Sequence, residues 1–146
     1  MIEPLAGQTL PALPFVVCDS AGRILRSGSC PAEMVLLQAG EGERAFAGNA
    51  DGSTQYILGL DLAPAAVARP VSPVTIDKTT VAADGTDAVV VSSIGVGAAI
   101  SIAGPVPSEG TGDGTDLHIT FEQAGRYTIT VRRFPDLDFV ATVNAA

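Results

Sequence analysis

The chain has 146 residues, of which 47% are hydrophobic and 16% are charged, with a formal charge of −8. This length suits one ordinary domain or two small ones, and the apolar fraction excludes a chain that is disordered throughout. The acidic charge excludes nucleic acid and disfavours anionic membrane as partners, because binding to phosphate needs Lys and Arg.

The composition favours a mainly β fold. The sequence holds 16 Gly and 10 Pro and no Trp, and its apolar residues are mostly Ala and Val, which indicates many turns and thin β layers. No run approaches the roughly 18 apolar residues needed to cross a bilayer. Residues 1–4 also lack the basic and apolar regions of a signal peptide. We therefore expect that the chain is made in the cytoplasm and that it does not insert into a membrane.

Proline-rich segments divide the chain. Residues 1–14 contain three prolines, which exclude a helix and predict an extended N-terminal arm. Residues 63–73 contain three more and are predicted to form a semi-rigid linker. The linker separates a first module, residues 15–62, from a second module, residues 74–146.

The first module is predicted to be small and β-rich with one short helix. A hairpin is expected from strands at 15–18 and 23–27 with a turn at 19–22. Pro31 and Glu33 resemble a helix start, and the helix is expected to end at Gly40 and to bury Met34, Val35 and Leu37. Two further strands are expected at 44–47 and 54–58.

The second module has the clearest alternation in the chain. Apolar residues alternate with polar ones on both sides of the turn at 122–125, at Leu117, Ile119 and Phe121 and then at Tyr127, Ile129 and Val131. A period of two buries one face of a hairpin and exposes the other. Further strands are expected at 74–76, 81–82, 88–94, 98–102 and 139–144. About seven short strands in this length predict a compact sandwich.

Two segments of the second module resemble bacterial and phage immunoglobulin-like domains. Residues 74–85 end in Ala-Asp-Gly, and residues 121–129 contain Ala-Gly-Arg-Tyr. In that family an Ala-Asp-Gly turn follows the first strand and an Ala-Gly-x-Tyr corner opens the penultimate strand. The resemblance implies an immunoglobulin-like β-sandwich with a tight turn at Asp84 and Gly85. It also implies that the Tyr127 hydroxyl reaches backbone.

The first module resembles a short module common in small structural proteins of tailed bacteriophages and prophages. Residues 19–24, 28–31, 37–43 and 54–56 carry the resemblance. Those proteins often continue with a proline linker and an immunoglobulin-like domain, and the order here is the same. The resemblance implies a virion component, either a tail-side accessory or fibre-attachment protein or a decoration on the capsid.

Few residues suggest chemistry. His118 is the single His and is expected to be exposed on a strand rather than to act as a base or metal ligand. The loop 109–116 holds three acids that could in principle bind Ca²⁺, although the order of ligands in a calcium loop is missing. Cys18 and Cys30 are expected to be thiols beyond bridging range of each other, and a bridge to a neighbouring subunit stays open.

We therefore expect a non-enzymatic structural protein of a tailed phage, with no catalytic, cofactor-binding or metal-binding residues and no cofactor. Its expected location is the virion, after synthesis in the cytoplasm of a bacterial host. Its partners would be tail, fibre or capsid proteins, bound in multiple symmetric copies. Capsid decoration is one alternative. Another is a carbohydrate-binding adhesin that contacts a host glycan, which requires exposed aromatic side chains among Tyr56, Phe134 and Phe139.

Overall fold

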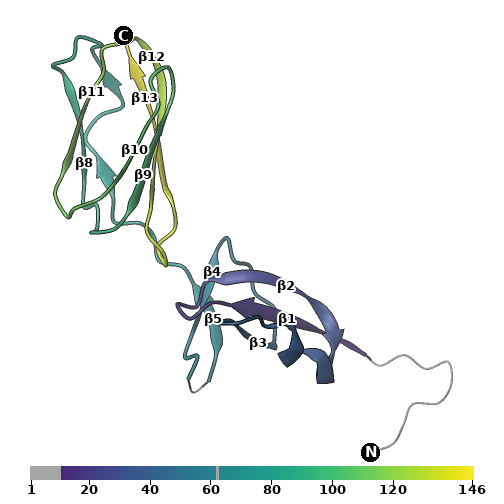
Figure 1. Cartoon of the computed structure of the whole chain (residues 1–146). Helices are drawn as coiled ribbons and strands as arrows, with labels where there is room; N and C mark the ends of the chain where they lie inside the picture. Colours follow the sequence, from purple (N-terminus) through teal and green to yellow (C-terminus); the bar gives the residue numbers. More distant parts are fainter. Residues whose placement is uncertain (1–10, 62) are drawn as a thin grey trace, which may run out of the picture. The chain divides into compact units, whose positions relative to one another are not determined.

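The structure, a computed structural model, describes residues 11–61 and 63–146. Its fold is mainly β, as the sequence predicts, and the chain divides into two compact units at Arg69 and Pro70 (Figure 1). This division falls inside the predicted linker. Residues 1–10 of the predicted N-terminal arm lie outside the described residues.

The first unit is built on β1 (Ala12–Cys18), the central strand of a three-stranded antiparallel sheet. β1 pairs with β2 (Ile24–Pro31) on one side and with β3 (Arg44–Ala47) on the other. The predicted hairpin and the predicted strand at 44–47 are therefore confirmed. β1 begins at Ala12 rather than at Phe15, so the predicted arm is wrong over its last residues.

Pro14 is accommodated within β1 because it lies at the end of a ladder. It pairs with Ser29 of β2, and its carbonyl oxygen accepts the Gly48 N–H at 2.9 Å. The N–H and C=O of one residue in an antiparallel strand point to the same side. Pro14 therefore lacks its N–H at the end of β3, beyond the last paired residue, where at most the final bond of the ladder is lost.

The turn between β1 and β2 is fixed by Asp19 and Gly22. The Asp19 carboxylate accepts two backbone N–H groups of the turn, both at 2.9 Å. Gly22 has a φ of 87°, and a Cβ there would lie 2.0 Å from the carbonyl oxygen of Ile57. The Ile57 N–H donates to the Gly22 carbonyl at 2.8 Å. Only glycine permits this approach of the hairpin to β4 (Gln55–Leu58).

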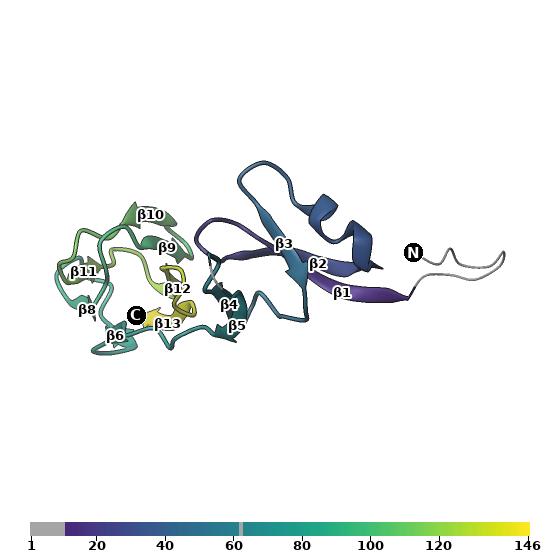
Figure 2. The same cartoon turned by 90° about the horizontal axis from the view of Figure 1, so that it is seen from below.

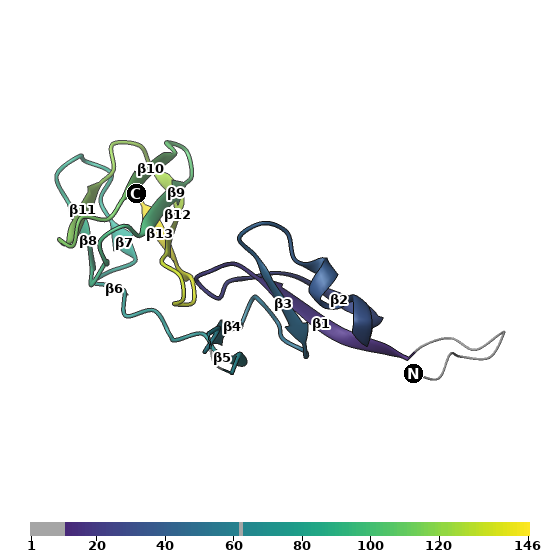
Figure 3. The same ribbon diagram turned by 60° about the horizontal axis from the view of Figure 1, so that its bottom comes forward.

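The predicted short helix is a pair of 3₁₀ turns, η1 (Ala32–Met34) and η2 (Leu36–Gln38), joined at Val35 (Figure 3). Val35 is buried against Phe15 and its neighbours, as predicted. Met34 and Leu37 are exposed, contrary to prediction. Single 3₁₀ turns do not align side chains along one face as an α-helix does, so only Val35 reaches the sheet.

The predicted linker contains a strand. β5 (Ala65–Ala68) pairs with β4 in an antiparallel ribbon in which Tyr56 opposes Val67. Residues 63–68 therefore belong to the first unit rather than to a linker. The ladder forms because Pro64 and Pro70 flank this strand and leave all four of its N–H groups intact.

Arg26 joins the sheet of the first unit to the segment that carries the two turns. Its guanidinium donates to both carboxylate oxygens of Glu43, at 2.6 and 3.2 Å, and to the Gln38 carbonyl at 2.6 Å. Glu43 also accepts the Gly40 N–H at 2.7 Å. These charge-assisted bonds, first those from Arg26 and then that from Gly40, lower the pKa of Glu43 from 4.5 to about 2.

The second unit is a β-sandwich of two sheets (Figure 2). One sheet has the order β11-β8-β6 and the other the order β10-β9-β12-β13-β7. The strands are β6 (Thr75–Ile76), β7 (Thr80–Val81), β8 (Ala88–Ser92), β9 (Ala99–Ala103), β10 (Ser108–Thr111), β11 (Leu117–Thr120), β12 (Gly125–Arg132) and β13 (Phe139–Ala145). The loop predicted at 109–116 is thus wrong in part, because its first residues pair with β9 as β10.

The alternation predicted for β12 is confirmed, but the predicted hairpin of β11 and β12 is wrong, because β11 pairs with β8 in the facing sheet. Tyr127, Ile129 and Val131 are buried between the sheets, while Arg132 is exposed. β12 lies between β9 and β13, so its ladder bonds are satisfied on both sides. It is therefore the strand around which the core of the second unit packs.

Tyr127 closes one end of this core. Its ring lies 4.4 Å from that of Phe121, centroid to centroid, and its hydroxyl donates to the Gln123 carbonyl at 2.8 Å. The expected contact of this hydroxyl with backbone is therefore confirmed. The bond satisfies the one polar group of a buried side chain and fixes the turn that leads into β12.

The turn at Asp84 and Gly85 is also present. The Asp84 carboxylate accepts the N–H groups of Thr86 and Asp87 at 2.9 and 2.8 Å, and Gly85 has a φ of 77°. Asp87 in turn bonds the Lys78 ammonium at 2.6 Å. This local network positions the start of β8.

We predict that Tyr127→Phe destabilises the second unit by about 1 kcal/mol, because it removes the hydroxyl bond and keeps the ring. Hydrogen exchange of the Ile129 amide in the full chain reports the global opening of this unit. Thr120→Val is the control, since its hydroxyl has no partner in the part of the chain that the structure describes. Equal protection in both variants would contradict the assigned role of the Tyr127 hydroxyl.

We predict that the stability contributed by Glu43 is present above pH 4.5 and is lost as the pH falls towards 2. The pKa of Glu43 is about 2 in the folded chain against an ordinary 4.5, and a carboxylate with a lowered pKa stabilises only while it is ionised. Glu43→Gln should therefore narrow the stability difference between pH 6 and pH 2.5 in urea unfolding. Glu41→Gln, in the same turn, should leave that difference unchanged.

Candidate functional site

One side of the sandwich in the second unit, called the open side below, ends in two edge strands. There β10 and β11 are the edge strands of their two sheets, and β10 pairs only with β9 and β11 only with β8 among residues 70–146. Figure 2 shows both edges on the same side, away from β6 and β13. Edge strands carry unpaired backbone N–H and C=O groups, which can bind another strand.

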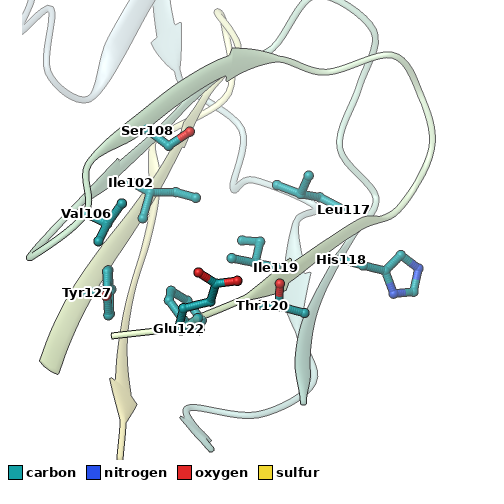
Figure 4. Close-up of a pocket in the computed structure, with 10 residues that line it drawn as sticks. Ile102, Val106, Ser108, Leu117, His118, Ile119, Thr120, Glu122 and Tyr127 are labelled. Atoms are coloured by element: carbon teal, nitrogen blue, oxygen red, sulfur yellow. The ribbon is translucent and has the colours of Figure 1, made fainter. Parts of the chain in front are cut away.

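A pocket of about 470 Å³ lies between these edges, and we call it the edge groove (Figure 4). Ile102 and Val106 form one wall, and Leu117 and Ile119 face them from β11. Ser108, His118, Thr120, Phe121, Glu122 and Tyr127 complete the lining. The lining of the groove is therefore mainly apolar, with Glu122 as its one carboxylate.

The walls of the edge groove are partly covered core side chains. Leu117 and Ile119 face inward, as the alternation predicts, but they are only half-buried. Val106 is 55% exposed. No strand of the described chain extends either sheet at this side, so the inward face of β11 remains accessible.

The segment that contains both edge strands carries acidic but no basic side chains. Residues 104–125 include four carboxylates and no Lys or Arg; the carboxylates are Glu109, Asp113, Asp116 and Glu122. Of these four, Glu122 lines the groove, and its carboxylate lies among the lining side chains (Figure 4). The site therefore combines an apolar floor with negative charge.

The imidazole of His118 is directed away from the groove. His118 is exposed on β11, as predicted, and its imidazole points away from the other lining side chains (Figure 4). Within residues 11–61 and 63–146, no three His, Cys, Asp or Glu side chains gather closely enough to hold a metal ion. The described residues thus offer no ligand set around this imidazole.

The acids of residues 109–116 do not converge. Glu109 lies in β10, whereas the Asp113 carboxylate accepts the N–H and the hydroxyl of Thr115, at 3.0 and 2.5 Å. These bonds lower the pKa of Asp113. Asp113 thus holds its own turn, a structural role that accounts for its place in the loop.

The two cysteines lie at opposite ends of the β1–β2 ladder and are free thiols. Cys18 opposes Ile24, and Cys30 opposes Leu13. Leu13 and Cys18 are about 16 Å apart along a strand that rises roughly 3.3 Å per residue, too far for a bridge between the two thiols. Burial raises the pKa of Cys18, while Cys30 is half-buried.

The first unit exposes a short apolar surface, the leucine turn, formed by Met34, Leu36 and Leu37. Leu36 and Leu37 are 77% and 74% exposed. Neighbouring large apolar side chains on a surface mark a contact site more often than scattered ones do. Sequence analysis assigns two of these residues to the core and therefore misses this surface.

The aromatic side chains considered for glycan binding are not strongly exposed. Tyr56, Phe134 and Phe139 are each only partly accessible, and Phe139 packs against the core of the second unit. None of the helices in the described ranges is long and apolar enough to span a membrane.

Comparison of the chain with protein-family models, with curated proteins and with solved structures found no match. The edge groove and the leucine turn are therefore read from this structure alone. Sequence analysis identifies the inward residues of β11 but not the groove. Only the pairing of strands reveals which edge of the sandwich stays open.

We predict that Cys30 reacts with iodoacetamide in the folded chain and that Cys18 reacts only after unfolding. The reason is that Cys18 has no exposed surface, and burial disfavours its thiolate. Peptide mapping by mass spectrometry after timed labelling, with and without urea, measures both sites. Equal labelling of the two thiols without urea would contradict the burial of Cys18.

Proposed function

We propose that this chain is a non-enzymatic structural protein of a tailed phage particle, a tail-side accessory or fibre-attachment component that binds neighbouring virion proteins. The observation that carries the proposal is the edge groove, which joins unpaired strand edges to an apolar lining. Such edges bind extended segments of other proteins by strand addition.

The details of the second unit support the resemblance to phage immunoglobulin-like domains. The Tyr127 hydroxyl bonds backbone before β12, and the turn at Asp84 and Gly85 precedes β8. A side-by-side order of β9, β12 and β13, with β8 and β11 in the facing sheet, is that of an immunoglobulin-like sandwich. Such sandwiches serve many functions, so the site carries the proposal and not the fold.

The leucine turn supports a second contact. Leu36 and Leu37 lie between β2 and β3 and are exposed in the first unit. The burial of each on a partner is worth roughly 1.5 to 3 kcal/mol. Repetition of such modest contacts around a symmetric particle yields strong attachment through avidity.

We predict that the chain is present in purified particles of the phage or prophage that encodes it. Quantitative mass spectrometry should give roughly tens of copies per particle for a tail component, because tails have low-order symmetry. Cryo-electron microscopy of the same particles should place the chain on the tail. Roughly hundreds of copies would instead establish capsid decoration, and absence from washed particles would contradict both.

A further inference from the structure

The free edge of β11 offers backbone groups for one more strand. β11 pairs with β8 through four residues, from Leu117 opposite Val91 to Thr120 opposite Ala88. In an antiparallel edge strand every second residue points its N–H and C=O away from the existing partner. An added strand beside β11 would satisfy these groups and extend the sheet.

The apolar side chains at this edge have the spacing of a strand. Leu117 and Ile119 are two residues apart and face inward, and Ile102 and Val106 lie across the groove (Figure 4). A strand added beside β11 would direct alternate side chains into the same space. Apolar side chains at every second position of the added strand therefore match the groove.

The charge of residues 104–125 favours basic residues in that strand. Glu109, Asp116 and Glu122 have no ion-pair partner among the described residues. Arg126 is the nearest basic residue in sequence and occupies the opposite face of β12 from Tyr127, which lines the groove. Lys or Arg side chains on an added strand would be attracted by the carboxylates of this segment, of which Glu122 lines the groove.

We propose that the edge groove binds an extended basic segment of a partner protein as an added β-strand beside β11. The bound segment carries apolar residues at alternate positions, which enter the groove. It also carries Lys or Arg residues, which are attracted by Glu122 in the lining and by the negative charge of residues 104–125. The proposal rests on the proposed function in one respect, that the natural partner is another virion protein. The chemistry of the bound segment follows from the groove alone.

A second copy of the chain is the less favoured occupant. The chain carries a formal charge of −8, with 16 acidic and 8 basic side chains. Two copies joined at this edge would bring the same carboxylates together, and like charges across an interface oppose association. The charge of the groove therefore favours a partner of opposite sign.

The test uses the full chain and three acetylated, amidated nonapeptides measured by isothermal titration calorimetry. The first peptide is Lys-Val-Lys-Val-Thr-Val-Lys-Val-Lys. In the second each Lys is replaced by Glu, and in the third the central Thr is replaced by Pro. We expect binding of the first peptide alone, weakened by salt, because Glu repels the carboxylates and Pro interrupts strand pairing. Amide exchange of residues 117–120 should slow in the first complex.

Two substitutions at the groove separate its apolar and charged parts. Val106→Gln should weaken the first peptide about tenfold, through lost apolar burial. Its control is Val140→Gln, because Val140 is 60% exposed on β13 and does not line the groove. Glu122→Lys should weaken binding about fivefold and reduce its dependence on salt. Its control is Glu41→Lys, in the first unit, and neither control should change the affinity.

Several results would overturn this proposal. The first is that the Lys peptide does not bind at millimolar concentration. The second is that the Glu or Pro peptide binds as tightly as the Lys peptide. The third is that the groove variants and their controls change the affinity equally. Dimerisation of the free chain in sedimentation that is lost in Val106→Gln would assign the groove to a second copy instead. If the chain is present in particles but does not bind the peptide, the proposed function stands and the proposal for the groove is rejected. If the chain binds the peptide but is absent from particles, the proposal for the groove stands and the proposed function is rejected.

Discussion

The strict alternation of side chains along β12 is the constraint on which the second unit depends. Tyr127, Ile129 and Val131 fill the space between the sheets, and a shift of one residue would bury Thr128 and Thr130 instead. The ladders to β9 and β13 hold this register from both sides. The Tyr127 hydroxyl bond then anchors the turn at which the register begins.

The same alternation explains why the edge of the sandwich is apolar. Leu117 and Ile119 must face inward because β11 pairs with β8 in the register of the core. At an edge without a further strand, the inward side chains remain half-buried, and the apolar surface left exposed lowers the stability of the domain. Proteins commonly protect such edges with charge, and the four carboxylates of residues 109–122 lie in or next to β10 and β11 in the sequence. Protection against self-association and selection of a basic partner thus arise from the same residues.

Sequence analysis predicts the strands that have apolar alternation and flanking turn residues. It misses the strands that form only because a neighbouring strand pairs with them. The hairpin of β1 and β2 and the buried face of β12 have apolar alternation and turn residues, so they could be found. β5 is mostly Ala and β10 is Ser-Glu-Gly-Thr, residues that become strands only when a neighbour supplies the ladder. Sequence analysis also misses the two 3₁₀ turns, because Val35 is the one side chain of this segment that is buried in the core. The groove is a property of pairing and has no local signature.

The two units present surfaces of different chemistry. The leucine turn of the first unit offers Leu36 and Leu37 as exposed apolar side chains, whereas the edge groove of the second unit combines apolar walls with the Glu122 carboxylate. An apolar surface binds by burial alone and tolerates high salt, but an acidic groove discriminates by charge and weakens with salt. A chain with both can hold one neighbour firmly and select another. This is the physical basis on which we interpret it as a connector between different proteins rather than as a self-assembling subunit.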